Sequence, residues 1–237
     1  MLRLSAFVLV AVAVVFSVQA DPAAPSTAAA PAPATAASTP AAQDPTILLH
    51  EAMEALQDKQ IDEALAKVNT VIQLAPQNVD GYGLRGGIYA EQKDWEKAIQ
   101  DYQKILQLDP NNAQAKFNMA EIAFLQKKYD EARPGFIAME KDPNLGELAT
   151  YKVFLCDLFG GQADTAAREL QAFEQVGSGA SYYFAEAASS LYQKKPEDAR
   201  GWLTSAANIY SPAKFKLYSA SLFDLGYLPL PPAPGQN

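Results

Sequence analysis

The sequence is poor in the residues that most often carry chemistry. Among 237 residues it has one histidine, His50, and one cysteine, Cys156. This leaves little for a metal centre or for nucleophilic catalysis that depends on histidine. A lone cysteine has no partner within the chain, so we expect Cys156 to be a buried thiol, with an intermolecular crosslink as the alternative. No cofactor site is expected, and the composition argues against an enzyme.

Positive charge is also scarce. The chain has 19 lysines and arginines against 27 aspartates and glutamates, which gives a net charge of −8 and a pI near 4.7. This balance argues against nucleic acid as a partner, because its phosphates need a basic surface. We expect carboxylates such as those of Asp130, Glu131 and Glu169 to lie on solvated helix faces rather than in a catalytic pair.

A long hydrophobic run is missing as well. The stretch from Leu4 to Val18 is apolar apart from two serines, but a permanent anchor needs about 20 apolar residues. Arg3 precedes this stretch, and Val18 and Ala20 occupy the −3 and −1 positions of a signal peptidase site. Residues 1–20 are therefore predicted to be a cleaved signal peptide. The protein would be exported to the periplasm or the extracellular space, with no membrane span in the mature chain. The alternative is an uncleaved N-terminal anchor.

Two segments are too rich in proline for regular structure. Residues 21–44 contain 11 Ala, 5 Pro and 5 Ser or Thr, so a helix cannot propagate and nothing large is available to bury. We expect a disordered linker there, acting as a spacer or as a passive tail. Residues 228–237 carry four prolines and are predicted to form a Pro-rich tail.

What the sequence does contain is an internal repeat. The segments QLAPQN at 73–78 and QLDPNN at 107–112 lie 34 residues apart. Alanines in the same register continue this spacing, with a last step of 33 residues: Ala64, Ala98, Ala132, Ala166 and Ala199. Apolar side chains between them recur at helical spacing, as in Leu65, Val68 and Ile72. A period of this length indicates stacked units that share one core.

The 34-residue unit resembles the tetratricopeptide repeat, in which two helices, A and B, form a helix–turn–helix. In the second unit the matching residues are Tyr82, Gly86 and Tyr89 in helix A and Trp95, Ala98, Tyr102 and Pro110 in and after helix B. The resemblance implies an all-α solenoid over residues 45–227. Its five repeats would span 45–78, 79–112, 113–146, 147–179 and 180–212, and a capping helix would follow at 213–227.

Four residues depart from the pattern. Arg85 replaces an apolar residue in helix A of the second unit. Phe154 stands where the fourth unit needs a small residue, so we expect its two helices not to pack in the usual way. Pro134 and Gly135 lie inside helix B of the third unit, where proline removes a backbone hydrogen bond. We therefore expect a bend or a change of superhelical pitch near residues 134–154.

One motif points to a different function. Gly81-Tyr-Gly83-Leu-Arg-Gly86 matches the GxGxxG pattern of dinucleotide-binding loops. That pattern holds a pyrophosphate only between a strand and a helix. Here it lies within helix A of the second unit, so we interpret the glycines as contacts between helices and expect no nucleotide.

The resemblance also implies where a partner would bind, because helix A of each repeat lines a concave groove. The family's clamp for a carboxylate terminus is incomplete here, with only Asn118 and Lys152 in suitable positions. The predicted partner groove is instead mainly apolar and consists of Leu49, Met53, Leu84, Phe117, Asn118, Phe124, Tyr151, Lys152, Leu155, Phe159 and Phe184. Such a groove suits an extended or helical segment with large side chains. Replacing Phe117 and Phe124 by serine would then abolish partner capture without unfolding the chain.

These patterns together predict an exported, non-enzymatic scaffold that binds a protein or peptide segment of unknown identity. The alternative function is a structural spacer or accessory subunit of a cell-envelope assembly or polysaccharide-processing machine. For the groove itself three alternatives stay open: an error of register in repeats four and five, self-capping by the Pro-rich tail, or a homodimer.

Overall fold

The computed structural model describes residues 44–176 and 179–228. The predicted signal peptide, nearly all of the linker and nearly all of the Pro-rich tail lie outside these residues. All regular structure within the described part of the chain is α-helical, which confirms the predicted fold class. None of the described helices is both long and apolar enough to cross a membrane.

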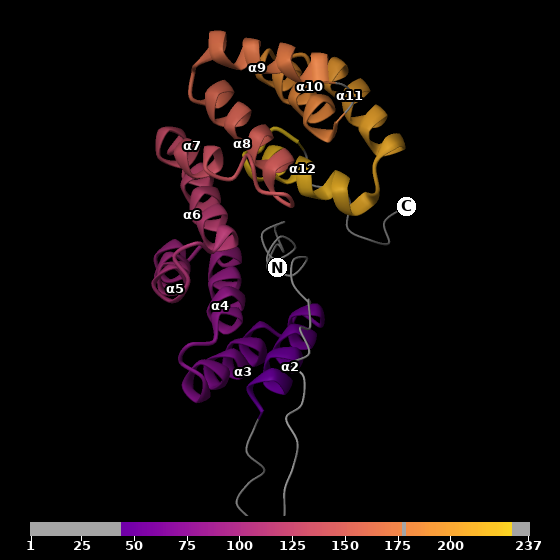
Figure 1. Cartoon of the computed structure of the whole chain (residues 1–237). Coiled ribbons are helices and arrows are strands. Elements are labelled where there is room, and N and C mark those ends of the chain that lie inside the picture. Colours follow the sequence, from indigo (N-terminus) through magenta and orange to yellow (C-terminus); the bar gives the residue numbers. More distant parts are fainter. Residues whose placement is uncertain (1–43, 177–178, 229–237) are drawn as a thin grey trace, which may run out of the picture.

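The described helices form consecutive pairs followed by a single last helix (Figure 1). The A helices are α2 (Pro45–Gln57), α4 (Val79–Glu91), α6 (Ala113–Leu125), α8 (Gly146–Phe159) and α10 (Ala180–Tyr192). The B helices are α3 (Ile61–Leu74), α5 (Trp95–Leu108), α7 (Tyr129–Ile137), α9 (Ala163–Val176) and α11 (Pro196–Ile209). The last helix is α12 (Pro212–Asp224). The pairs follow one another at the spacing of the sequence repeat.

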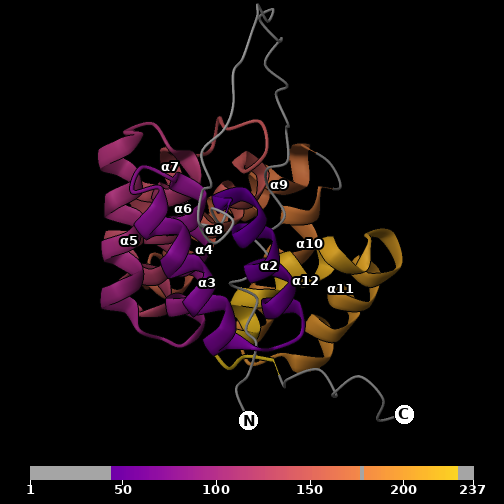
Figure 2. The same cartoon turned by 90° about the horizontal axis from the view of Figure 1, so that it is seen from below.

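The pairs stack into an arch (Figures 1 and 2). The A helices lie on the inside of the arch and the B helices on the outside, so the A helices form its inner face. Each pair packs against the next one along the chain. A single pair cannot bury both of its apolar faces, and the stack solves this by sharing a core between neighbours.

Short polar side chains set where many of the helices begin. Asn78 and Asn112 cap α4 and α6, because their side-chain oxygens accept hydrogen bonds from the backbone N–H groups of Gly81 (2.7 Å) and Ala115 (2.9 Å). Asp94 caps α5 in the same way. Such caps satisfy backbone donors that the first turn of a helix leaves unpaired. The helix boundaries are therefore encoded locally.

The turn between helices A and B has the same backbone in every pair. Its second residue has a positive φ, near 60° in Lys59, Lys93, Lys127 and Lys194 and 84° in Gly161. The next N–H reaches back to a carbonyl five residues earlier, as in the bond from Asp94 to Tyr89 (2.9 Å). This is the Schellman ending of a helix, which normally places glycine at the left-handed position. Four of these five turns use lysine instead.

Small side chains let the two helices of a pair come close. The repeat alanines Ala64, Ala98, Ala132, Ala166 and Ala199 are all at most 2% exposed. At Gly86 a Cβ atom would lie 3.0 Å from a ring carbon of Tyr102 in the paired helix, and at Gly135 it would lie 2.8 Å from Cβ of Ala120. The Gly81–Gly86 motif lies within α4, so its glycines belong to helix packing, as predicted.

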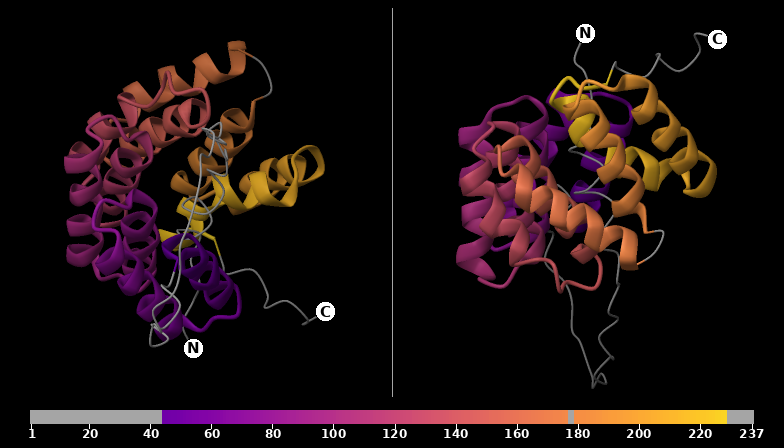
Figure 3. Two further views of the ribbon diagram at one scale, coloured as in Figure 1. Left: turned by 60° about the horizontal axis from the view of Figure 1, so that its bottom comes forward. Right: turned by 90° about the horizontal axis from the view of Figure 1, so that it is seen from above.

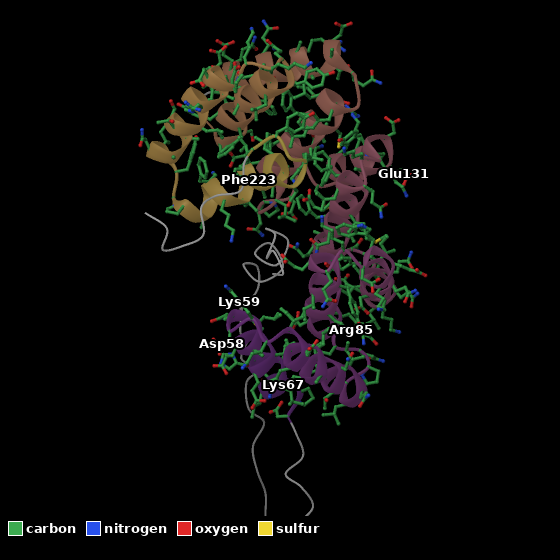
Figure 4. The ribbon with its side chains drawn as sticks, turned by 180° about the vertical axis from the view of Figure 1, so that it is seen from behind. Asp58, Lys59, Lys67, Arg85, Glu131 and Phe223 are labelled. Atoms are coloured by element: carbon green, nitrogen blue, oxygen red, sulfur yellow. The ribbon has the colours of Figure 1, made fainter. Side chains whose placement is uncertain are left out.

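Arg85 departs from the apolar pattern because it joins three helices (Figure 4). Its guanidinium donates two hydrogen bonds to the carboxylate of Asp101 in α5, at 2.9 and 2.7 Å, and one to Asn69 in α3, at 2.7 Å. Asp101 is only 4% exposed. The planar guanidinium matches a carboxylate in this two-bond geometry, so the buried charge is compensated.

The stack changes at the third and fourth pairs. Helix α7 contains Pro134 and has 9 residues, whereas α3, α5, α9 and α11 have 14 each. Phe154 of α8 is fully buried and its ring packs edge-on against Phe173 of α9. As a result α8 packs more extensively against α7 and α10 than against α9. The expected break near residues 134–154 is confirmed, and the stack turns there (Figure 1).

The lysine turns give a first prediction. A left-handed conformation costs a residue with a Cβ about 1–2 kcal/mol, while glycine adds about 0.5–1 kcal/mol of unfolded-state entropy. Lys93→Gly and Lys127→Gly should therefore each raise the free energy of unfolding, by about 0.5–1 kcal/mol. Urea denaturation measures this. The reverse change, Gly161→Lys, serves as the control and should destabilise the chain, because a Cβ there meets no atom within 4 Å and only the backbone is strained. Equal stability of all three variants would mean that the left-handed backbone at these turns costs lysine no more than glycine.

Candidate functional site

The inner face of the arch is where the predicted partner groove was placed. Eight of the eleven predicted residues are buried in the structure, and only Leu49, Met53 and Phe159 keep partial exposure. The structure therefore corrects the prediction of an open apolar groove along the whole face. Neighbouring helices and α12 cover these side chains, so most of them contribute to the core.

Phe117 and Phe124 of α6 are buried by the repeat packing itself. Both are 0% exposed. The ring of Phe136 in α7 packs edge-on against each of them, with centroids 5.3 and 6.3 Å away. The predicted serine substitutions at these positions would thus damage the core rather than remove a binding surface.

The inner face of α8 and α10 is covered by α12. Tyr218 of α12 lies against Tyr151 of α8 (centroids 5.5 Å apart) and stacks on Phe184 of α10 (5.4 Å). Phe215 packs edge-on against Phe184 as well (5.3 Å), and Leu222 is 0% exposed. Figure 3 shows α12 within the curve of the arch. A capping helix was predicted for residues 213–227, but its position inside the arch was not.

Lys152 does not serve as a free clamp residue, because the chain itself satisfies it. Its ammonium lies 2.6 Å from one carboxylate oxygen of Glu121 and donates to the other at 2.7 Å. It also donates to the hydroxyl of Ser221 in α12, at 2.6 Å. Because Lys152 is only 3% exposed, its ion pair with Glu121 is shielded from water. The direct contacts of the ammonium must therefore compensate for the lost hydration. Asn118 is likewise buried and accepts a hydrogen bond from Gln114.

Two more contacts hold the ends of α12. At its start, the Lys214 ammonium lies 3.0 Å from the carboxylate of Glu147 in α8. Beyond its end, Tyr227 stacks on Phe159 at a centroid distance of 4.7 Å. The hydroxyl of Tyr151, by contrast, is buried and has no hydrogen-bond partner among the described residues. An unpaired buried polar group costs about 1–3 kcal/mol.

The inner face of the first pair keeps partial exposure. Leu49 and Met53 of α2 are partly buried and pack against a cluster that includes Leu84 and Ile88 of α4. Figure 4 places Phe223 of α12 on the opposite limb of the arch from Lys67 and Arg85. The two limbs therefore face each other across the inside of the arch.

One titratable cluster lies away from the inner face, at the irregular fourth pair. Arg133 of α7 donates two hydrogen bonds to Asp157 of α8, at 2.7 and 2.8 Å, and lies 3.8 Å from Glu169 of α9. Burial, followed by the charge of Asp157, raises the pKa of Glu169 to about 7, against the opposing effect of Arg133. Glu140 adds a further negative charge. The Glu169 side chain is 26% exposed, so the expected position on a solvated helix face holds only in part.

The single cysteine and the single histidine lie on different helices, α8 and α2. Cys156 is buried, as predicted, and burial raises the pKa of its thiol far above the ordinary value, so the thiolate is suppressed. His50 is exposed and lies 3.3 Å from Glu54 on the same helix. No group of three or more metal-ligating side chains occurs among the described residues.

Comparison with known proteins agrees with the helix pairs. The family model of the tetratricopeptide repeat matches residues 79–112, which contain α4 and α5. The second helix pair therefore matches a tetratricopeptide repeat. A segment of 58 residues is 40% identical to the UDP-N-acetylglucosamine–peptide N-acetylglucosaminyltransferase of Giardia intestinalis. That segment is 24% of this chain but only 4% of the length of that protein.

Solved tetratricopeptide-repeat structures share the fold. PilW, a widely conserved type IV pilus biogenesis factor, is 18% identical, with 77% of this chain and 86% of that chain covered and a TM-score of 0.57. A tetratricopeptide-repeat protein from Parabacteroides merdae is 19% identical, with 77% and 72% covered and a TM-score of 0.59. YrrB, which has an unusual peptide-binding site, is 18% identical, with 74% and 91% covered and a TM-score of 0.50.

The burial of Phe117 gives the second prediction. Phe117→Ser should lower the free energy of unfolding by about 3–5 kcal/mol, because it leaves a cavity and places a hydroxyl in the core. Thermal or urea denaturation measures this. Ile47→Ser is the control, since Ile47 is 58% exposed and should lose little stability when replaced. A stable Phe117→Ser protein would mean that Phe117 faces an open groove after all.

The Arg133 cluster gives the third prediction. A carboxyl whose pKa is raised on folding stabilises the fold at low pH, and this contribution is lost as the pH rises from about 4.5 to about 7. Urea unfolding of Glu169→Gln should show a shallower fall of stability across this window than the unaltered chain, by up to about 1 kcal/mol per pH unit. Glu131→Gln, a change at an exposed carboxyl of α7, should leave the slope unchanged. Identical slopes for Glu169→Gln and the unaltered chain would mean that burial does not raise the pKa of Glu169.

Proposed function

We propose that the protein is an exported, non-catalytic scaffold that binds a segment of another protein on the inner face of its arch. The single observation that carries this proposal is that the inner face of α8 and α10 already holds a helix, α12, by aromatic and polar contacts. A surface that is shaped and lined to take one helical segment is suited to take another.

The fold supports the same function. Stacked repeats expose long curved faces, and such faces serve mainly to bind other macromolecules. The lone histidine, the buried cysteine and the lack of a metal-ligating group in the described residues offer no machinery for a reaction. Export is supported by the leader sequence at residues 1–20. The 58-residue likeness to a glycosyltransferase covers too little of that enzyme to suggest its activity here.

A second candidate is a spacer or accessory subunit in a cell-envelope assembly. It is favoured by the likeness in fold to PilW, which is a pilus biogenesis factor, and by the leader with its Ala- and Pro-rich linker. A spacer contacts its neighbours along the outer faces of the B helices, whereas a binding scaffold contacts its partner on the inner face. The two functions therefore differ in the surface that is used.

Site-specific photo-crosslinking in the native cell tests the proposal. A photoreactive amino acid replaces Met53 on the inner face or Glu131, an exposed residue at the outside of the arch (Figure 4). We expect a discrete protein adduct from position 53 and none from position 131. Adducts from position 131 alone would support the spacer, and no adduct from either position would count against both functions. Circular dichroism of each variant checks that it folds.

A further inference from the structure

We propose that α12 is an internal ligand of the inner face, and that the partner binds as an amphipathic helix that takes the place of α12 on α8 and α10. This inference rests on the proposed function and adds the chemistry of the partner and the competition that regulates its binding.

Helix α12 carries the features of a docked ligand helix. Phe215, Tyr218 and Leu222 follow one another at spacings of three and four residues, which places them on one side of the helix. All three contact or lie within the cluster that includes Tyr151 and Phe184. Recognition of a helix in a groove uses anchors at this same spacing. The contacts of α12 therefore show which side chains a helix needs in order to bind this surface.

Helix α12 is also encoded independently of the surface on which it lies. Ser211 caps its start, with the hydroxyl accepting from the backbone N–H of Lys214, and Pro212 occupies the first turn. Gly226, with a φ of 81°, ends it, and the N–H of Tyr227 bonds to the carbonyl of Leu222 at 2.8 Å. Both ends are completed by residues of the segment itself, so the boundaries of α12 do not depend on the inner face. Only Tyr210 and Ser211 connect it to α11.

The docked helix leaves part of the surface unsatisfied. The buried residues of α12 are Tyr218, Ser219, Ser221 and Leu222, and two of these are serines with little apolar surface. In the surface below, the Tyr151 hydroxyl is buried and unpaired, and the one contact that α12 makes with the Lys152 ammonium, whose charge Glu121 balances, is through a neutral hydroxyl. A helix that offers a stronger acceptor to these groups would bind better than α12 does.

These contacts define the partner. It is an amphipathic helix with an aromatic residue in the place of Tyr218 and apolar residues three positions before and four after it. A basic residue in the place of Lys214 would meet Glu147. A carboxylate or amide oxygen near the place of Ser221 would accept from Lys152, and a similar oxygen that the Tyr151 hydroxyl can reach would satisfy that group. A purely acidic or an extended segment does not fit, because the surface that α12 covers is aromatic and is matched by apolar side chains at helical spacing.

The test uses a synthetic peptide of residues 211–228 as the probe and the mature chain as the receptor. In the receptor, Tyr218→Ala with Leu222→Ala weakens the internal helix while leaving α8 and α10 intact. Fluorescence anisotropy should show that this variant binds the labelled peptide at least about tenfold more tightly than the unaltered chain, because a larger fraction of its inner face is free. Lys216→Ala, at an exposed position of α12, is the matched control and should bind like the unaltered chain. A peptide with Tyr218→Ala should not bind the variant.

A folded variant that binds the peptide no better than the unaltered chain would overturn the inference, since α12 would then be a fixed part of the core. If the variant does not fold, hydrogen exchange of the unaltered chain decides. Amides of α12 should exchange at least about tenfold faster than those of α8 and α10, and equal protection would overturn the inference. A partner that crosslinks at position 53 but does not compete with the peptide would keep the proposed function and reject this inference.

Discussion

The fold depends on the close approach of two helices at one small side chain in every pair. The five repeat alanines are almost completely buried, and at Gly86 the ring of Tyr102 leaves no room for a larger residue without a shift. Where the two helices of a pair touch at these small residues, the longer side chains around the contact can pack against the next pair. Because neighbouring pairs share their core, each crossing supports two layers of the stack. The fourth pair lacks the small residue in helix A, because Phe154 occupies the position that Gly86 has in the second pair. Its helix α8 packs more extensively against α7 and α10 than against its paired helix α9.

Two arginines compensate for irregularities of the stack. Arg85 ties α4 to α3 and α5, and Arg133 ties α7 to α8 beside Glu169 of α9. Each forms a two-bond contact with a nearly buried aspartate, which fixes the angle between helices as well as their distance. Arg133 lies within the shortened helix α7, next to the fourth pair, in which α8 packs less extensively against α9 than against α7. Its contacts with the carboxylates of Asp157 and Glu169, on two different helices, make this junction sensitive to pH.

The repeat could be predicted from sequence because its signals are local and recur. Alanine spacing, the caps at Asn78 and Asn112, and the prolines after the B helices all act within a few residues of the structure that they specify. Burial of the inner face could not be predicted in this way. Tyr151 and Phe184 occupy positions that an isolated repeat exposes, and they are covered only because α12, far along the chain, folds back over them. Lys152 likewise satisfies its charge with residues 31 and 69 positions away. Sequence patterns identify which residues face the inside of the arch, but not what else lies there.

The return of α12 onto α8 has a consequence for biosynthesis. Most contacts in the stack join neighbouring pairs and can form while the chain is still emerging, but the bond between Lys152 and Ser221 spans 69 residues. Until Pro212 and the residues after it are made, Tyr151 and Phe184 have nothing from α12 to cover them. A chain that stops short therefore displays an aromatic surface that a finished chain conceals. Helix α12 thus distinguishes a chain that extends past residue 224 from one that stops before it, and a chaperone or protease that recognises exposed aromatic residues can bind the uncovered surface.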